Sequence, residues 1–437
     1  MPLRTTLAAT ATALGLGLVA SPATAAEIQF WHAMSGRLNE LLDEQVAKFN
    51  ESQDAHTVVA TNKGNYSEAL NAGIAAFRAG EQPTILQVFE VGTATMMNAK
   101  GAIVPVHELM ADTGKEFDPS IYLAAVTGYY TTTDGEMLSL PYNSSTPVLY
   151  VNDDALAEAD ASDMPLETWD DVGAVLAKLK ESGHECPMTT AWQSWIHLEN
   201  LSAYHDVPFA SKENGFAGTD AELELDGEAQ TAHVAKLGEW AEDGLFVYSG
   251  RRNEGGARFN AGECALFTES SAGYANTKAQ AEFDFSIHPL PYYEGVGSAP
   301  QNTIIGGASL WVMAGKGEEE YEAAAEFLNF LSTPDIQAQW HQDTGYLPIT
   351  MAAYEQTKES GFYEENPGTD IAIVQMTGKA PTANSKGIRL GNFDQIRAVI
   401  DEELEAVWAG DKSAEDAMAS ASERGDELLR RFERTAR

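Results

Sequence analysis

The chain has 437 residues, of which 66 are acidic and 27 are lysine or arginine, so its formal net charge is −39. This acidity argues against nucleic acids and anionic membranes as partners, because both repel a strongly negative protein. A hydrophobic content of 44% is typical of a globular chain, and the length favours two domains rather than a single core.

Residues 1–26 have the pattern of a cleaved secretory signal. Arg4 supplies a positive charge, an apolar run extends from Leu7 to Ala20, and small residues occupy positions 23–26. We expect the mature protein to begin near Glu27 and to reside in the periplasm as a monomer. The alternative of an N-terminal membrane anchor is less favourable, because the apolar run is short and contains threonines and glycines.

Hydrophobic periodicity predicts alternating strands and helices in the first hundred residues. Strands are expected over 27–31, 56–61 and 84–89, with helices after the first strand, over 67–77 and over 92–97. Because a helix separates each strand from the next, we expect an α/β fold with a parallel sheet.

Two extended stretches, Leu140–Val151 and Asn302–Ala314, are predicted to carry the chain between two lobes. Thr168 is predicted to cap a helix whose apolar residues recur at helical spacing. Further strands are expected over 262–268 and 283–290, and further helices over 321–331, after Pro334 and over 395–408.

The mature sequence lacks the signatures of a hydrolase nucleophile, a zinc protease, a phosphate-binding loop and a dinucleotide site. We therefore expect a binding protein without a cofactor, not an enzyme. His184 and Cys186 have half of a metal-site spacing, but no second pair lies nearby, so no metal is expected. Cys186 and Cys264 are the only cysteines, and either a disulfide or two buried thiols fits an exported chain.

Aromatic, hydroxyl and amide groups gather at predicted strand ends, where α/β proteins bind ligands. Seven segments resemble the extracytoplasmic glycerol-3-phosphate-binding proteins of ABC transporters, and the resemblance spans nearly the whole mature chain. These segments are Lys63–Tyr66, Glu90–Thr95, Asn143–Tyr150, Ala191–Trp195, Gly306–Trp311, Thr344–Ile349 and Gly387–Asn392, followed by Arg397.

The resemblance implies a two-lobed periplasmic-binding-protein fold, in which each lobe is a sheet flanked by helices and crossover hinges join the lobes. The expected N-terminal lobe comprises residues 27–143 and 309–348, and the C-terminal lobe comprises 144–308 and 349–437. The membrane subunits of a transporter are then the expected partners. The implied ligand contacts are Tyr66, Glu90, Ser145, Trp192, Ser270, Gly307, Tyr346 and Arg397.

Those residue types suit glycerol-3-phosphate, or a glycerophosphodiester such as glycerophosphocholine. Arg397 would pair with the phosphate, hydroxyl and amide donors would complete its hydrogen bonds, and Glu90 would accept from the glycerol hydroxyls at the far end from the phosphate. An oligosaccharide-binding protein is the alternative with the same fold. A secreted phosphodiesterase or glycosidase that uses Glu90 and Glu269 is another alternative.

Several of these residues also have purely structural interpretations. Arg397 can pair with Asp401 on an exposed helix, and Glu90 can serve as the acidic residue of a helix N-terminus. Trp192 and Trp195 are three apart, so a helical turn would place them on one face. The polar neighbours of Trp192 favour the cleft for that residue, and Trp195 fits either the core or the cleft.

Overall fold

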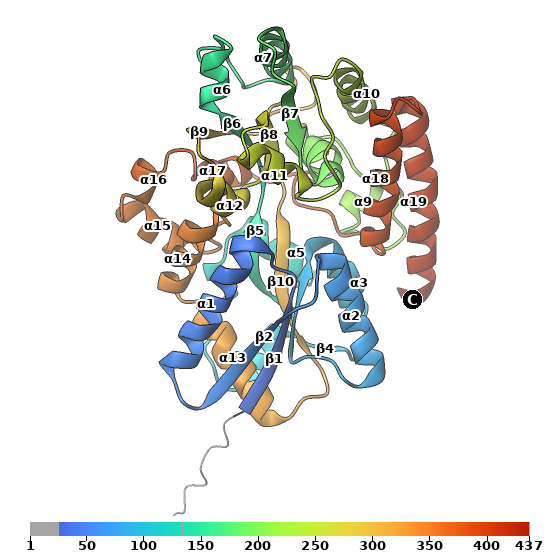
Figure 1. Cartoon of the computed structure of the whole chain (residues 1–437). Coiled ribbons are helices and arrows are strands. Elements are labelled where there is room, and N and C mark those ends of the chain that lie inside the picture. The colour runs from blue at the N-terminus through green and yellow to red at the C-terminus, as the bar shows by residue number, and fades with distance from the viewer. Residues whose placement is uncertain (1–25, 133, 437) are drawn as a thin grey trace, which may run out of the picture.

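The computed structural model describes residues 26–132 and 134–436, so the predicted signal peptide lies outside the described residues except for Ala26. Two sheets form the centres of two lobes, which lie one above the other in Figure 1. The expected two-lobed α/β fold is confirmed. No described helix has both the length and the apolar character that a membrane span needs.

The first sheet contains the N-terminal strands and one strand from much later in the chain. Its order is β2-β1-β3-β10-β4, and β5 also pairs with β10. The strands are β1 (Ala26–His32), β2 (His56–Asn62), β3 (Ile85–Phe89), β4 (Ile103–Val104), β5 (Leu140–Ser145) and β10 (Gly306–Met313).

The prediction of a parallel sheet is correct for β1, β2 and β3 and wrong for β10. β10 runs antiparallel to β3, β4 and β5. The physical reason is that β10 enters this sheet from the other lobe. Its direction is therefore not set by a strand–helix–strand crossover, which is what makes neighbouring strands parallel.

The second sheet has the order β7-β8-β6-β9 and is also mixed. β7 and β8 are parallel, whereas β6 is antiparallel to both β8 and β9. The strands are β6 (Pro147–Asn152), β7 (Cys186–Thr190), β8 (Cys264–Ser270) and β9 (Phe285–His288).

The two predicted crossovers lie side by side between the sheets. β5 ends at Ser145 and β6 begins at Pro147, so the chain leaves the first sheet at Thr146. The Thr146 hydroxyl donates to the Thr303 hydroxyl at 2.7 Å, just before β10 begins. These two connections between the lobes therefore run side by side, and we call this region the waist.

Helices cover both faces of each sheet (Figure 1). Around the first sheet they are α1 (Gly36–Ser52), α2 (Tyr66–Ala79), η1 (Glu90–Gly92), α3 (Thr93–Met97), α4 (Val106–Asp112), η2 (Pro119–Ile121), α5 (Ala124–Tyr130) and α13 (Glu318–Leu331). Around the second they are α6 (Asp153–Glu158), α7 (Trp169–Glu181), η3 (Trp195–Asn200), α8 (Leu201–Tyr204), α9 (Ser211–Asn214), α10 (Glu228–Glu242), α11 (Glu254–Asn260), α12 (Gly273–Gln280), α18 (Phe393–Trp408) and α19 (Ala414–Ala436). The remaining helices are α14 (Pro334–Thr344), α15 (Met351–Glu359), α16 (Phe362–Glu365) and α17 (Ile371–Thr377).

Helix α7 begins where its cap was predicted. The Thr168 hydroxyl accepts from the Asp171 amide at 3.0 Å, and the Asp171 carboxylate accepts from the Thr168 amide at 2.9 Å. This reciprocal capping box satisfies two amides at the helix start. The apolar face of α7, which includes Val172 and Leu176, is fully buried in the core of the second lobe.

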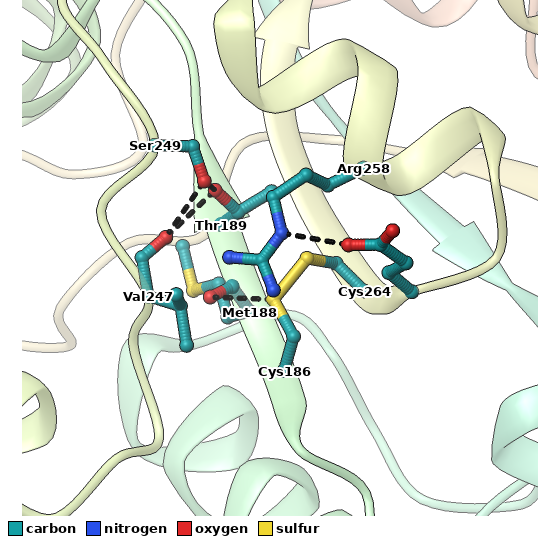
Figure 2. The surroundings of a disulfide bond; sticks show 8 residues. Cys186, Met188, Thr189, Val247, Ser249, Arg258 and Cys264 are labelled. Carbon is teal, nitrogen blue, oxygen red and sulfur yellow. Dashed lines mark hydrogen bonds and ion pairs between the residues drawn. A yellow bond between two sulfur atoms is a disulfide. The ribbon is translucent and has the colours of Figure 1, made fainter.

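Cys186 and Cys264 are joined by a disulfide at the amino ends of β7 and β8 (Figure 2). Their Cα atoms lie 4.6 Å apart as directly paired residues of the two parallel strands. The carboxyl ends of the same strands continue to the cleft described below. The bond therefore ties together the strand ends that are remote from that cleft.

Candidate functional site: a cleft between the lobes

A cavity of about 810 Å³ lies between the lobes. All the ligand contacts that the sequence implied line it, together with Trp195, which had been assigned to either the core or the cleft. These residues are Tyr66, Glu90, Ser145, Trp192, Trp195, Ser270, Gly307, Tyr346 and Arg397.

The wall formed by the first lobe includes Tyr66, the first residue of α2. The side chain of Asn65 caps this helix by accepting a hydrogen bond from the backbone amide of Glu68 at 3.0 Å. This cap fixes the start of the helix at Tyr66. The Tyr66 ring stacks on the Phe89 ring, with the two ring centroids 5.3 Å apart. The Tyr66 hydroxyl accepts a hydrogen bond from the side-chain Nδ2 of Asn143 at 2.9 Å. Burial raises the pKa of Tyr66, so the hydroxyl stays protonated and can donate a hydrogen bond.

The waist between the lobes contributes Ser145, Gly307 and Tyr346. Gly307 has φ +99°, and a Cβ there would lie 1.8 Å from the Asn143 carbonyl oxygen, so only glycine fits this close approach of β5 and β10. Tyr346 is held in place because the next amide, of Leu347, donates to the Ser144 carbonyl at 2.7 Å. Hydroxyl and amide donors thus come together beside the chain crossing.

Trp192 and Trp195 line the wall formed by the second lobe, but not as two residues of one helical turn. Trp192 precedes the helix and has φ +44°, a strained conformation for a bulky residue that is most often found at functional sites. Trp195 begins the π-helical turn η3. Its indole packs directly against Gly306, because a Cβ added to this glycine would lie only 2.5 Å from the indole ring. Trp195 therefore contacts both the waist and the cavity.

Arg397 of α18 lies at the centre of a buried charge cluster. Its Nε and Nη2 donate to the two carboxylate oxygens of Glu199 at 2.6 and 2.8 Å. Its Nη2 also donates to Glu90 at 2.5 Å. The three side chains of Arg397, Glu90 and Glu199 are 10%, 5% and 1% exposed.

This cluster overturns two expectations. Arg397 pairs with Glu199 and Glu90 and forms no ion pair with Asp401 in the described residues. A phosphate on Arg397 with Glu90 at the far end from that phosphate is also ruled out as a combination, because the two side chains are in direct contact. A buried guanidinium and a buried carboxylate each need an opposite charge, and this need outweighs their separation along the chain.

The pKa values of the pair reflect this arrangement. Burial lowers the pKa of Arg397, but the two carboxylates outweigh burial and raise it, so the guanidinium stays charged. Burial raises the pKa of Glu90 despite the nearby arginine. With one cation and two carboxylates, the cluster carries a net charge of −1 when all three groups are ionised. The net charge of the ionised cluster would therefore repel a phosphate dianion.

Glu269 and Ser270 end β8 at the cavity. The Ser270 hydroxyl accepts from the Ala272 amide at 3.1 Å, which leaves its proton free to donate to a ligand. Glu269 is 2% exposed, and its Oε1 accepts from the Ser270 amide at 2.6 Å. Burial raises the pKa of Glu269 to about 8.

Direct contacts between the lobes close the mouth of the cleft. The Ser67 hydroxyl of α2 donates to Asp394 of α18 at 2.6 Å and accepts from Arg252 at 3.2 Å. The Arg37 amide of α1 donates to the side chain of Asn276 in α12 at 3.3 Å. Together with the pair of Glu90 and Arg397, these contacts describe a closed conformation.

Three site residues were missed or assigned another role from the sequence. Glu199 was missed because its place on a π-helical turn has no signal in a 3.6-residue pattern. Arg252 lines the cavity, and an adjacent arginine pair in such an acidic chain is a signal that could have identified it. Glu269 was given a role of its own only as a catalytic carboxylate, although it lies in a segment expected to bind ligand, and the sequence has no sign that it is so deeply buried.

Residues 44–369 match the family described as bacterial extracellular solute-binding protein. The chain is 50% identical over 431 residues to the sn-glycerol-3-phosphate-binding periplasmic protein of Escherichia coli, covering 98% of each chain. It is also 50% identical over 423 residues to the protein of that name from Yersinia pseudotuberculosis, covering 96% of each.

Two solved structures share the fold. One is UgpB from Mycobacterium tuberculosis in complex with glycerophosphocholine, with a TM-score of 0.77 and 20% identity over 93% of this chain and 98% of that chain. The other is a maltose-bound protein of T. maritima, with a TM-score of 0.76 and 18% identity over 92% of this chain and 100% of that chain.

Proposed function

The chain belongs to the family of bacterial extracellular solute-binding proteins, and on this premise we propose that it binds sn-glycerol-3-phosphate in the periplasm and delivers it to the membrane subunits of an ABC importer. The observation that carries the proposal is that every predicted ligand contact lines one cavity between the lobes. The half-identical relatives, which are named for this ligand, support it.

The phosphate is held mainly by neutral donors at the waist. Ser145, Ser270, the Gly307 amide and the Tyr346 hydroxyl can satisfy its oxygens without adding charge. Burial raises the pKa of Tyr346 to about 12, so its hydroxyl donates throughout the physiological range. Neutral donors suit this position because the nearby cluster around Arg397 has no surplus positive charge.

The glycerol hydroxyls lie at the cluster of Arg397 and Glu90. A carboxylate accepts from a diol, and the Nη1 group of Arg397 makes no hydrogen bond within the described residues, so it remains available as a donor. This assignment differs from the sequence-based one, in which Arg397 paired with the phosphate. It keeps the dianion away from Glu90, which touches the arginine.

Trp192 forms the apolar wall for the carbon chain. Its ring lies 6.3 Å from the Tyr66 ring of the opposite lobe, so the two aromatic side chains approach each other across the cleft. A short polyol backbone between them buries its carbon atoms against flat apolar surfaces. Trp195 lines the same cavity.

The protein captures its ligand without altering it. Its relatives are named as binding proteins, and the carboxylate that an enzyme would use, Glu90, is engaged by Arg397. Lobes made of residues 27–143 with 309–348 and of residues 144–308 with 349–437 would close on the ligand as rigid bodies. A permease that recognises the closed form would then sense occupancy.

Mass spectrometry of small molecules released from the purified protein tests this proposal. After incubation with glycerol-3-phosphate and removal of unbound ligand, denaturation should release the intact phosphate ester in one-to-one amount. Release of glycerol and inorganic phosphate would instead indicate an enzyme. Retention of maltose but not of the phosphate ester would indicate an oligosaccharide-binding protein.

A further inference from the structure

Trp192 adopts a backbone conformation that its own residue type disfavours. Its φ of +44° lies in the left-handed region, where the Cβ of a bulky residue is crowded. The residue nevertheless lines the cavity, and its ring lies 6.3 Å from the Tyr66 ring of the opposite lobe. Because such a conformation persists only where the surrounding structure enforces it, the contacts that hold the backbone at Trp192 also determine where the indole lies.

Gln193, the next residue, is fully buried and has its side-chain amide engaged at both atoms. Its Oε1 accepts a hydrogen bond from the indole Nε1 of Trp408 at 2.6 Å. Its Nε2 donates to the Tyr248 hydroxyl at 3.3 Å and to the backbone carbonyl of Asp401 at 3.4 Å. Within the described residues the cavity lining includes Trp192 but neither Gln193 nor Trp408. A buried amide with these partners fixes the chain at this point without reaching the ligand.

The backbone amide of Trp192 is held by a second segment. It donates to the carbonyl of Arg252 at 3.2 Å. The preceding residue, Arg251, is paired with Glu405 of α18 through two hydrogen bonds of 2.8 and 2.5 Å. The Tyr248 hydroxyl donates to the same carboxylate at 2.6 Å. Residues 248–252 are therefore bound to α18, and they present a fixed acceptor to the Trp192 amide.

These contacts with α18 come from the face of the helix that also carries Arg397. Asp401, Glu405 and Trp408 follow Arg397 at successive spacings of four, four and three residues, which places all four on one side of a helix. Arg397 lies at the cavity, and the other three contact Gln193 or residues 248–252. One helix face thus supports both the guanidinium and the segment that carries the indole.

We propose that Gln193 is a positioning residue for ligand binding. Held by Trp408, it keeps Trp192 in the left-handed conformation in which the indole forms the wall for the carbon chain. The inference rests on the proposed function, because it presumes that the ligand packs on this wall. Loss of the bond between Gln193 and Trp408 lets the backbone at Trp192 relax toward a favoured conformation and withdraws the indole from the ligand.

The test is calorimetric titration of the mature protein with glycerol-3-phosphate after each end of this hydrogen bond is removed in turn. Trp408→Phe removes the Nε1 donor and keeps an aromatic ring, whereas Gln193→Met keeps the length of the side chain and removes its amide. Each variant should bind about tenfold more weakly than the wild type, since apparent affinity falls with the fraction of molecules in the binding-competent conformation. Chemical denaturation of the same samples measures stability, so that affinities are compared among folded proteins.

Two controls separate positioning from stability. Trp240→Phe makes the same change at a buried tryptophan of the same core, one that forms no hydrogen bond with Gln193 in the described residues, and it should bind like the wild type. In a Trp192→Ala protein the indole is gone, so the substitution at Trp408 should cause no further loss of affinity. If Trp192→Ala binds too weakly to measure, the comparison of Trp408→Phe with Trp240→Phe decides alone.

Wild-type affinity in folded Trp408→Phe or Gln193→Met protein would overturn the inference and leave the proposed function intact. An equal loss of affinity in Trp240→Phe, or a further loss in the Trp192→Ala background, would also overturn it, because the effect would then not act through Trp192. Absence of glycerol-3-phosphate binding by the wild type would instead reject the proposed function.

Discussion

Arg397 and Glu90 form an ion pair across the cleft, with Nη2 of the arginine 2.5 Å from Oε1 of the glutamate. Glu199 holds the same guanidinium from the arginine's own lobe through two further hydrogen bonds. The contact of the arginine with Glu199 thus lies within one lobe, whereas its contact with Glu90 joins the two lobes. This pair connects ligand recognition with the conformational change.

Replacement of Arg397 by alanine should damage both stability and binding. Glu90 and Glu199 would remain buried without a cation, which typically costs about 3 to 5 kcal/mol of unfolding free energy. Affinity for glycerol-3-phosphate should fall by about 2 to 5 kcal/mol. Chemical denaturation and calorimetry measure the two effects. Unaltered affinity in a folded Arg397→Ala protein would remove this residue from the site.

The Glu90→Gln variant should have a milder and more selective effect. The amide keeps the shape and can still accept a hydrogen bond, but it loses the charge-assisted bond to the diol and to Arg397. We expect affinity for glycerol-3-phosphate to drop by about 1 to 3 kcal/mol, whereas weak binding of inorganic phosphate should persist. Glu40→Gln, at the exposed rim of the cavity, is the matched control. An equal loss for both ligands would contradict the assignment of Glu90 to the diol.

Ligand binding should close the lobes about the waist at Thr146 and Thr303. Tyr66 and Glu90 lie in the first lobe and Trp192 and Arg397 in the second, so only the closed form completes the site. Small-angle scattering should show a smaller radius of gyration when the wild type is saturated. The change should be reduced in Glu90→Gln. An unchanged radius in the saturated wild type would rule out large closure.

His197 and His233 should make the protein sensitive to acid. Their rings are buried with nitrogens 3.1 Å apart, and burial lowers the pKa of His197 to about 3 and that of His233 well below its usual value. Because the folded pKa lies below the unfolded value of about 6.5, the unfolded chain takes up protons first. Stability is thus complete above that pH and decreases as the pH falls below it.

Denaturation at pH 6 and pH 5 measures this effect. From pH 6 to 5 the wild type should lose about 1.2 kcal/mol more unfolding free energy than His233→Gln, which lacks one of these groups. Equal losses in the two proteins would show that His233 titrates normally in the fold.

The sequence predicted most elements wherever a local pattern determines structure. The cap at Thr168, the strands in the first hundred residues and both crossovers were correctly placed because they depend on neighbouring residues alone. The antiparallel direction of β10 was not, because it depends on the return of the chain from another lobe. Local periodicity has no information on that path.

The composition of the site was predicted more fully than its interactions. The residues that line the cavity followed from a family resemblance, but the partners of Arg397 did not. Glu199 is separated from Arg397 by 198 positions and reaches it from an irregular turn. Only the folded arrangement shows that two carboxylates share this arginine, and that arrangement moved the expected phosphate site toward the neutral donors at the waist.

The most direct test of the central claim is a calorimetric titration of the purified mature protein, freed of bound ligand, with glycerol-3-phosphate and, separately, with glycerol. The account predicts one-to-one binding of the phosphate ester and binding of glycerol at least about a hundredfold weaker, since the donors at the waist would then lack their acceptors. Equal affinity for glycerol and its phosphate, or tight binding of maltose with none of the phosphate ester, would contradict it.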